Sequence, residues 1–201
     1  MYKDIDHNKH VNAAEKAYIR QDKESETEEQ VQPKLPFRRI LHLRQTWAVV
    51  LGKFLTDGVW WFFLFWTPAY ISDIYGHRSD SLTAQILIFV LYAITMLSIV
   101  AAKLPTVIMN RTGKNAYESR MRAMLIFALF PLLGVLAQPL GSVSWWLTII
   151  VIGIVGAAHQ SWSANLYCVG SDLFPKSSVA TITGLNGMAG GVSASLINVF
   201  S

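Results

Sequence analysis

The chain has 201 residues, of which 52% are hydrophobic and 15% are charged, and its formal net charge is +4. The charged residues are unevenly distributed, because the sequence has no Asp, Glu, Lys or Arg from Ala123 to Ser171. A soluble domain of this length cannot bury so long an uncharged stretch, whereas a lipid bilayer selects one, so the composition excludes an ordinary soluble domain.

Taken in chain order, residues 1–33 are polar and acidic toward their end, and they lack the apolar segment of a signal peptide. They are predicted to form a cytoplasmic linker or tail. A basic stretch opens the remaining part, 34–201, which is predicted to be a bundle of membrane helices. Its apolar runs predict five spans, near 46–72, 81–104, 120–139, 143–170 and 177–201. The predicted fold class is therefore an all-α integral membrane protein.

Basic residues alternate between the two sides of this arrangement. The first, third and fifth segments outside the spans hold Lys34, Arg38, Arg39, Arg44, Lys103, Arg111, Lys114, Arg120, Arg122 and Lys176, while the opposite side holds only Arg78. By the positive-inside rule, the N-terminal tail, the loop 103–122 and the loop 170–177 are expected in the cytoplasm. The odd number of spans and the apolar end suggest a chain cut short before a last helix.

Two charges interrupt the first apolar run. Lys53 and Asp57 are four residues apart, so they lie on one helix face. Charged side chains inside a membrane are costly and usually face a partner or a wet cavity. Two interpretations stay open: the two residues neutralise one another as an internal ion pair, or Lys53 receives an anionic substrate.

A polar cluster, His159 to Asn165, interrupts the fourth run. Gln160 and Asn165 are candidates for binding a hydroxyl-rich ligand, and equally for hydrogen bonding to neighbouring helices. For His159 we favour hydrogen bonding to a neighbouring helix. Aromatic rings near these charged and polar positions either stack on the apolar face of a sugar ring or pack ordinarily. These rings are Trp60, Trp61 and Trp162.

Glycines recur at helical spacings of three and four in the fifth run, at Gly184, Gly187, Gly190 and Gly191. Such a face lets helix backbones approach closely, so we predict a helix-packing surface. Asn186 is the polar side chain beside it that would reach a pore.

Three segments together resemble a known group. Gly52 to Pro68, Ala158 to Asn165 and Gly187 to Gly191 are similar to hexuronate transporters of the anion:cation symporter family, in the major facilitator superfamily. The run from Asn110 to Lys114, followed by Arg120, is similar to the basic loop motif of that superfamily. The resemblance covers about residues 34–201 and corresponds to the seventh through eleventh helices, the C-terminal half without its last helix.

The resemblance implies proton-coupled uptake of galacturonate or glucuronate by alternating access across the cell inner membrane. Lys53 would pair with the uronate carboxylate and Asp57 would tune Lys53. The sugar site would be lined by Trp60, Trp61, Gln160, Trp162 and Asn165. Proton-coupling acids are expected mainly in the other half, supplied by a separate chain or missing, so we expect this partial carrier to be inactive alone.

The main alternative is a membrane anchor or subunit that does not transport and holds a partner through its glycine-rich helix. The sequence offers no nucleophile and base at a recognisable spacing, no phosphate loop and no His/Cys metal set, so we expect neither an enzyme nor a metal or cofactor. The basic residues are explained by membrane topology, so no nucleic-acid partner is expected. The single Cys168 excludes an internal disulfide.

Overall fold

A computed structural model describes residues 11–18, 35–76, 78 and 80–200. In these residues the regular structure is helical and contains no strand, so the predicted all-α fold is confirmed. Besides helical residues 13–18, the helices are α2 (Phe37–His42), α3 (Arg44–Tyr75), α4 (Leu82–Thr95), α5 (Ser98–Ala101), α6 (Leu104–Thr112), α7 (Ala116–Leu129), the 3₁₀ helix η2 (Phe130–Leu136), α8 (Ala137–Gly141), α9 (Trp145–Leu173) and α10 (Lys176–Phe200).

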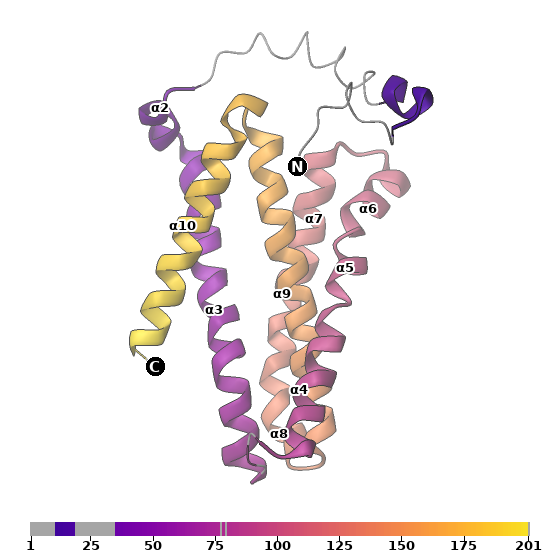
Figure 1. Cartoon of the computed structure of the whole chain (residues 1–201), viewed down its shortest axis with the longest axis vertical. Helices are drawn as coiled ribbons and strands as arrows, with labels where there is room; N and C mark the ends of the chain where they lie inside the picture. Colours follow the sequence, from indigo (N-terminus) through magenta and orange to yellow (C-terminus); the bar gives the residue numbers. More distant parts are fainter. Residues whose placement is uncertain (1–10, 19–34, 77, 79, 201) are drawn as a thin grey trace.

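Two of the long apolar segments are built from several short helices. Turns after Thr95 and Ala101 separate α4, α5 and α6, and Pro105 lies in the first turn of α6. Proline lacks a backbone N–H, so it is accepted at a helix start and breaks the ladder that precedes it. Pro131 has the same position in η2. In each segment the short helices still follow one another from one end of the bundle to the other (Figure 1).

Helix α9 lies at the centre of the bundle (Figure 1). It contacts α3, α4, α5, α7, η2, α8 and α10, while α10 packs mainly along α3. Half of the most apolar segment of α9 is buried, against 17–22% for the other three long apolar helical segments. One core cluster joins Ile71 of α3, Leu87 of α4 and Ile149 of α9. The polar residues of α9 are therefore placed inside the protein, where they meet other helices.

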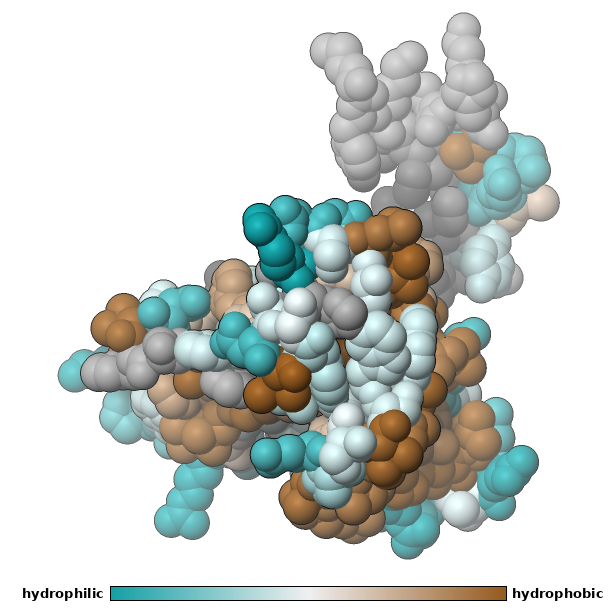
Figure 2. Space-filling view, turned by 90° about the horizontal axis from the view of Figure 1, so that it is seen from below, coloured by the Kyte–Doolittle hydropathy of each residue, from teal (hydrophilic) through white to brown (hydrophobic). Residues whose placement is uncertain are grey.

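The outer surface is strongly apolar. Large hydrophobic side chains such as Phe89, Val135 and Val143 are more than two-thirds exposed, and in Figure 2, which views the bundle from below, brown, apolar residues are prominent around its edge. Four helical segments are long and apolar enough to cross a membrane: Arg44–Tyr75, Leu82–Thr112, Ala116–Gly141 and Trp145–Leu173. The fifth predicted span is also a helix, α10, but its Gly, Ser, Thr and Asn residues make it less apolar and it is not among these four.

The helices extend past the predicted ends of the spans. The expected loop 103–122 shrinks to residues 113–115, because α6 continues to Thr112 and α7 begins at Ala116. Likewise, α8 carries the third span through Pro139 to Gly141. Hydropathy marks where lipid ends, whereas backbone hydrogen bonds continue into the polar flank. Most of the predicted tail, 1–33, lies outside the described residues.

The short turn between α6 and α7 is specified locally. Gly113 adopts a left-handed conformation, with φ 66°, and ends α6. The side chain of Asn115 then accepts a hydrogen bond of 2.7 Å from the backbone N–H of Glu118 and caps α7. Figure 1 places this turn, α2 and the α9–α10 turn at the same end of the bundle. The predicted basic segments thus share one end.

Candidate functional site

The ammonium group of Lys53 is buried between α3 and α9. Lys53 is 5% exposed, and its Nζ lies 2.8 Å from Oδ1 of Asp57, one turn further along α3. From α9, Ser163 accepts a hydrogen bond of 2.6 Å from Nζ, and the ring of Tyr167 lies 4.4 Å below it. The carboxylate, the hydroxyl and the aromatic face together stabilise the cation, whereas lipid or apolar side chains alone would not stabilise it. Lys53 therefore has its charge held inside the bundle rather than extended to the surface.

His159 of α9 extends the contact between α3 and α9 from Lys53 toward the C-terminal end of α3. Its Nε2 lies 2.7 Å from the carbonyl oxygen of Thr56, and its ring stacks on Trp60 with 5.7 Å between ring centroids. The Nδ1 atom of His159 is buried and has no hydrogen-bond partner among the described residues. We call the turn of α3 from Lys53 to Asp57 the charged turn. Polar side chains of α9 thus face the charged turn over several helical turns.

Helix α10 packs against the side chain of Asp57. A Cβ atom at Gly190 would overlap the carboxylate of Asp57, and one at Gly58 would lie 2.6 Å from the hydroxyl of Ser193. In contrast, Cβ atoms at Gly184, Gly187 and Gly191 would meet no described atom within 4 Å. Of the four predicted packing glycines, only Gly190 is a position where an added Cβ would meet another atom in the described part of the chain, and that atom belongs to a charged side chain.

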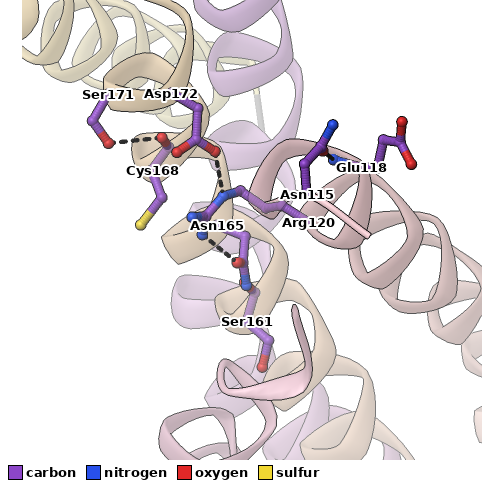
Figure 3. A network of polar contacts seen from close by, with 8 residues as sticks. All are labelled: Asn115, Glu118, Arg120, Ser161, Asn165, Cys168, Ser171 and Asp172. Carbon is purple, nitrogen blue, oxygen red and sulfur yellow. Dashed lines mark hydrogen bonds and ion pairs between the residues drawn. The ribbon is translucent and has the colours of Figure 1, made fainter. Parts of the chain in front are cut away.

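A second polar network joins α7 to α9 near the end of the bundle that carries the basic segments (Figure 3). Arg120 donates from Nε to Oδ2 of Asp172 at 2.7 Å and from Nη1 to Oδ1 of Asn165 at 3.1 Å. Asn165 in turn donates to the carbonyl oxygen of Ser161 at 2.8 Å. The side chains of Arg120 and Asp172 are each less than one-fifth exposed. The amide of Asn165 is therefore engaged in linking two helices.

The remaining candidates are dispersed. Trp61 stacks on Phe65 of its own helix. Trp162 packs against two core clusters, which include Val49 and Ala158, and Gln160 is half-buried, with no hydrogen bond to its side chain among the described residues. The structure thus brings Lys53, Asp57 and Trp60 together with His159 but places Asn165 in the second network.

Three partners of the charged turn escaped the sequence reading: Thr56, Ser163 and Tyr167. A signal was present, because His159, Ser163 and Tyr167 recur every four residues and so form one stripe on α9. Matching that stripe to Lys53 and Asp57 requires the pairing of the helices, which is not a local property.

Cavities lie beside the charged turn rather than at it. A cavity of about 710 Å³ opens between α3, η2, α8 and α9, and is lined by apolar and aromatic residues with Asp73 and Gln138. None of the predicted site residues lines it. Trp60 instead borders a space of about 10 Å³ next to Thr95 and Gly156. In the described residues, no three His, Cys, Asp or Glu side chains are grouped to hold a metal.

Comparison with known proteins gives the family. Residues 9–197 match the Major Facilitator Superfamily. The hexuronate transporter of Escherichia coli (strain K12) is 27% identical over 199 residues, an overlap of 97% of this chain and 44% of the relative. The hexuronate transporter of Escherichia coli O157:H7 has the same identity and coverage. No solved structure matches.

The chain spans less than half the length of the curated relatives it matches. The family match nevertheless covers nearly the whole chain, and the four long apolar helical segments agree with it. This chain, a multi-pass membrane protein similar to hexuronate transporters, belongs to the Major Facilitator Superfamily, whose members are transporters rather than enzymes.

Proposed function

We propose that this chain forms one side of the substrate path of a proton-coupled hexuronate transporter, with Lys53 as the group that binds the uronate carboxylate. The observation that carries the proposal is the buried ammonium of Lys53, held 2.8 Å from Asp57 and 2.6 Å from Ser163. Charged side chains inside membrane helices mark substrate or ion paths. The names of the similar proteins indicate a hexuronate as the class of substrate, and galacturonate or glucuronate are the hexuronates that we propose.

Asp57 has a defined part in this proposal. In the absence of substrate it neutralises Lys53, which lowers the cost of burying the ammonium group. A uronate carboxylate then competes with Asp57 for the same cation. Of the three tryptophans proposed to line the sugar, Trp60 stacks on His159, whose Nε2 lies 2.7 Å from the carbonyl oxygen of Thr56, the residue before Asp57. The side-chain amide of Gln160 has no hydrogen-bond partner among the described residues, whereas Trp61, Trp162 and Asn165 have their described contacts elsewhere.

The proposal includes topology. The end of the bundle that carries α2, the α6–α7 turn and the α9–α10 turn is proposed to be cytoplasmic, in the inner membrane, because the basic segments gather there. In carriers of this architecture the substrate lies between two helical bundles. We propose that a second bundle, comparable to the part of the relatives that this chain does not span, supplies the opposite wall.

Binding of labelled galacturonate to the full chain in lipid nanodiscs tests this function. Lys53→Gln is expected to weaken binding by about 10- to 100-fold, the worth of a hydrogen bond to a charged group. Lys53→Arg is expected to retain part of the affinity, because the charge remains while the planar guanidinium fits less well. Lys103→Gln, at an exposed lysine, is the matched control. Competition by galactose, which lacks the carboxylate, should be much weaker than competition by glucuronate.

Two results would contradict the assignment. Equal affinity of the parent and Lys53→Gln would leave Lys53 and Asp57 as a structural ion pair. An absence of hexuronate binding by the parent chain, both alone and when co-expressed with the N-terminal portion of a hexuronate transporter, would favour the second candidate, an anchor that holds a partner. The open faces of Gly184, Gly187 and Gly191 are the observation that favours this alternative.

A further inference from the structure

His159 is a titratable side chain inside the bundle to which the proposed substrate site gives no role. Its Nε2 lies 2.7 Å from the carbonyl oxygen of Thr56. A carbonyl oxygen only accepts hydrogen bonds, so Nε2 must carry the hydrogen. In the neutral ring, the lone pair is then on Nδ1. The contact with α3 thereby fixes which nitrogen is free to bind a proton.

The free nitrogen is enclosed. Nδ1 is buried and has no hydrogen-bond partner in the residues that the structure describes. A sugar hydroxyl cannot reach an atom without solvent-exposed surface, whereas a proton can be delivered during a brief local opening. A proton is therefore the ligand that suits this nitrogen best.

The charges around the ring are few. From α3, Asp57 follows Thr56 directly, Lys53 lies one turn before, and both interact electrostatically with His159. On α9 itself, Tyr167 lies beneath Lys53. Helix α4 contributes the neutral Thr95 beside Gly156, and Arg120 of α7 is paired with Asp172 in the second network. While Lys53 and Asp57 are paired with one another, their charges largely cancel at the ring.

We propose that His159 binds the coupling proton at Nδ1, and that anion binding at Lys53 drives its protonation. This inference rests on the proposed function of Lys53. The uronate carboxylate takes over the ammonium group of Lys53 and releases the carboxylate of Asp57. The freed negative charge stabilises an imidazolium at His159, which takes its proton from water. One ion pair and a neutral ring thus become two ion pairs, with one proton taken up for each anion.

The first test needs no substrate. Lys53→Gln frees Asp57 as anion binding would, so the ¹⁵N NMR titration midpoint of His159 should rise by about one pH unit or more. Asp57→Asn leaves Lys53 unopposed and should lower the midpoint. Lys103→Gln, at an exposed position, should change nothing. An unchanged midpoint in Lys53→Gln overturns the inference, and if that variant does not fold, the same midpoint in Asp57→Asn as in the parent overturns it.

The second test counts protons. Calorimetry of galacturonate binding in two buffers of different ionisation enthalpy should show uptake of about one proton per uronate by the parent at a pH where free His159 is neutral. His159→Gln should still bind uronate but take up no proton, whereas His42→Gln, at an exposed histidine, should behave as the parent. Undiminished proton uptake by His159→Gln refutes the inference alone. Absence of uronate binding by the parent, both alone and when co-expressed with the N-terminal portion of a hexuronate transporter, refutes the proposed function, and the NMR result then decides whether His159 responds to the charge of Asp57.

Discussion

The carboxylate of Asp57 fills the space that a side chain at Gly190 would occupy. This fit couples the charged turn of α3 to the packing of α10, because the acid can pair with Lys53 only where α10 has no Cβ. The glycine therefore has a local electrostatic consequence in addition to allowing two helices to approach.

Gly190→Ala is expected to displace Asp57 from Lys53 and to lower the free energy of unfolding by about 1–3 kcal/mol, as overpacking does. Thermal unfolding of the chain in detergent measures the loss. Gly187→Ala is the control on the same helix, since its Cβ would meet no described atom within 4 Å. Equal stability of the two variants would show that the contact with Asp57 carries no constraint.

Arg120 and Asp172 are expected to be coupled energetically. A double-mutant cycle with Arg120→Ala and Asp172→Ala should give an interaction free energy of about 0.5–3 kcal/mol, since the pair shares a network with Asn165. The Lys114–Glu118 pair, 3.1 Å apart but more exposed, should give about 0.3–0.5 kcal/mol. Chemical unfolding of each variant supplies the values. If the first pair gave no more than the second, the network would not stabilise the α7–α9 contact.

Tyr75 is expected to anchor the end of α3 on the α8–α9 turn. Its hydroxyl donates to Oγ1 of Thr148 at 3.0 Å, and it would lie 2.6 Å from a Cβ at Gly141. Tyr75→Phe should therefore cost about 0.5–1.5 kcal/mol of stability. Gly141→Ala should cost less in the Tyr75→Phe background than in the parent, because one of the two clashing hydroxyls is gone, while that of Thr148, 2.8 Å from the added Cβ, remains. Additive losses in thermal unfolding would contradict this contact.

The chain alone is expected to give no transport, since a carrier site is built between two bundles. Vesicles that contain only this chain should therefore not accumulate labelled galacturonate above the level of empty vesicles. Co-expression with the N-terminal portion of a hexuronate transporter is the companion measurement, in which uptake would support a two-part carrier. Accumulation by this chain alone would refute the prediction.

Local properties of the sequence determined the membrane fold and the basic segments that share one end. Hydropathy and charge act on each segment directly, so the runs around Lys53 and His159 were recognisable as helices with polar interruptions. The exact helix ends were not recognisable from the sequence, because backbone hydrogen bonds extend α6 to Thr112, beyond the apolar run. The spacing of Lys53 and Asp57 predicted that they share one face, and the structure pairs them at 2.8 Å.

Only the tertiary structure decided which side chains meet that pair. Ser163 binds Lys53 from 110 positions away in the sequence, and Asn165, two residues further on, points instead to Arg120. The register between two helices depends on how all their side chains fit along the whole contact. Residues two positions apart lie about 200° apart around a helix, so the rotation of α9 about its axis decides which of these two residues faces Lys53. The sequence therefore determined that polar groups of α9 lie inside the bundle, and helix packing determined which of them contact Lys53.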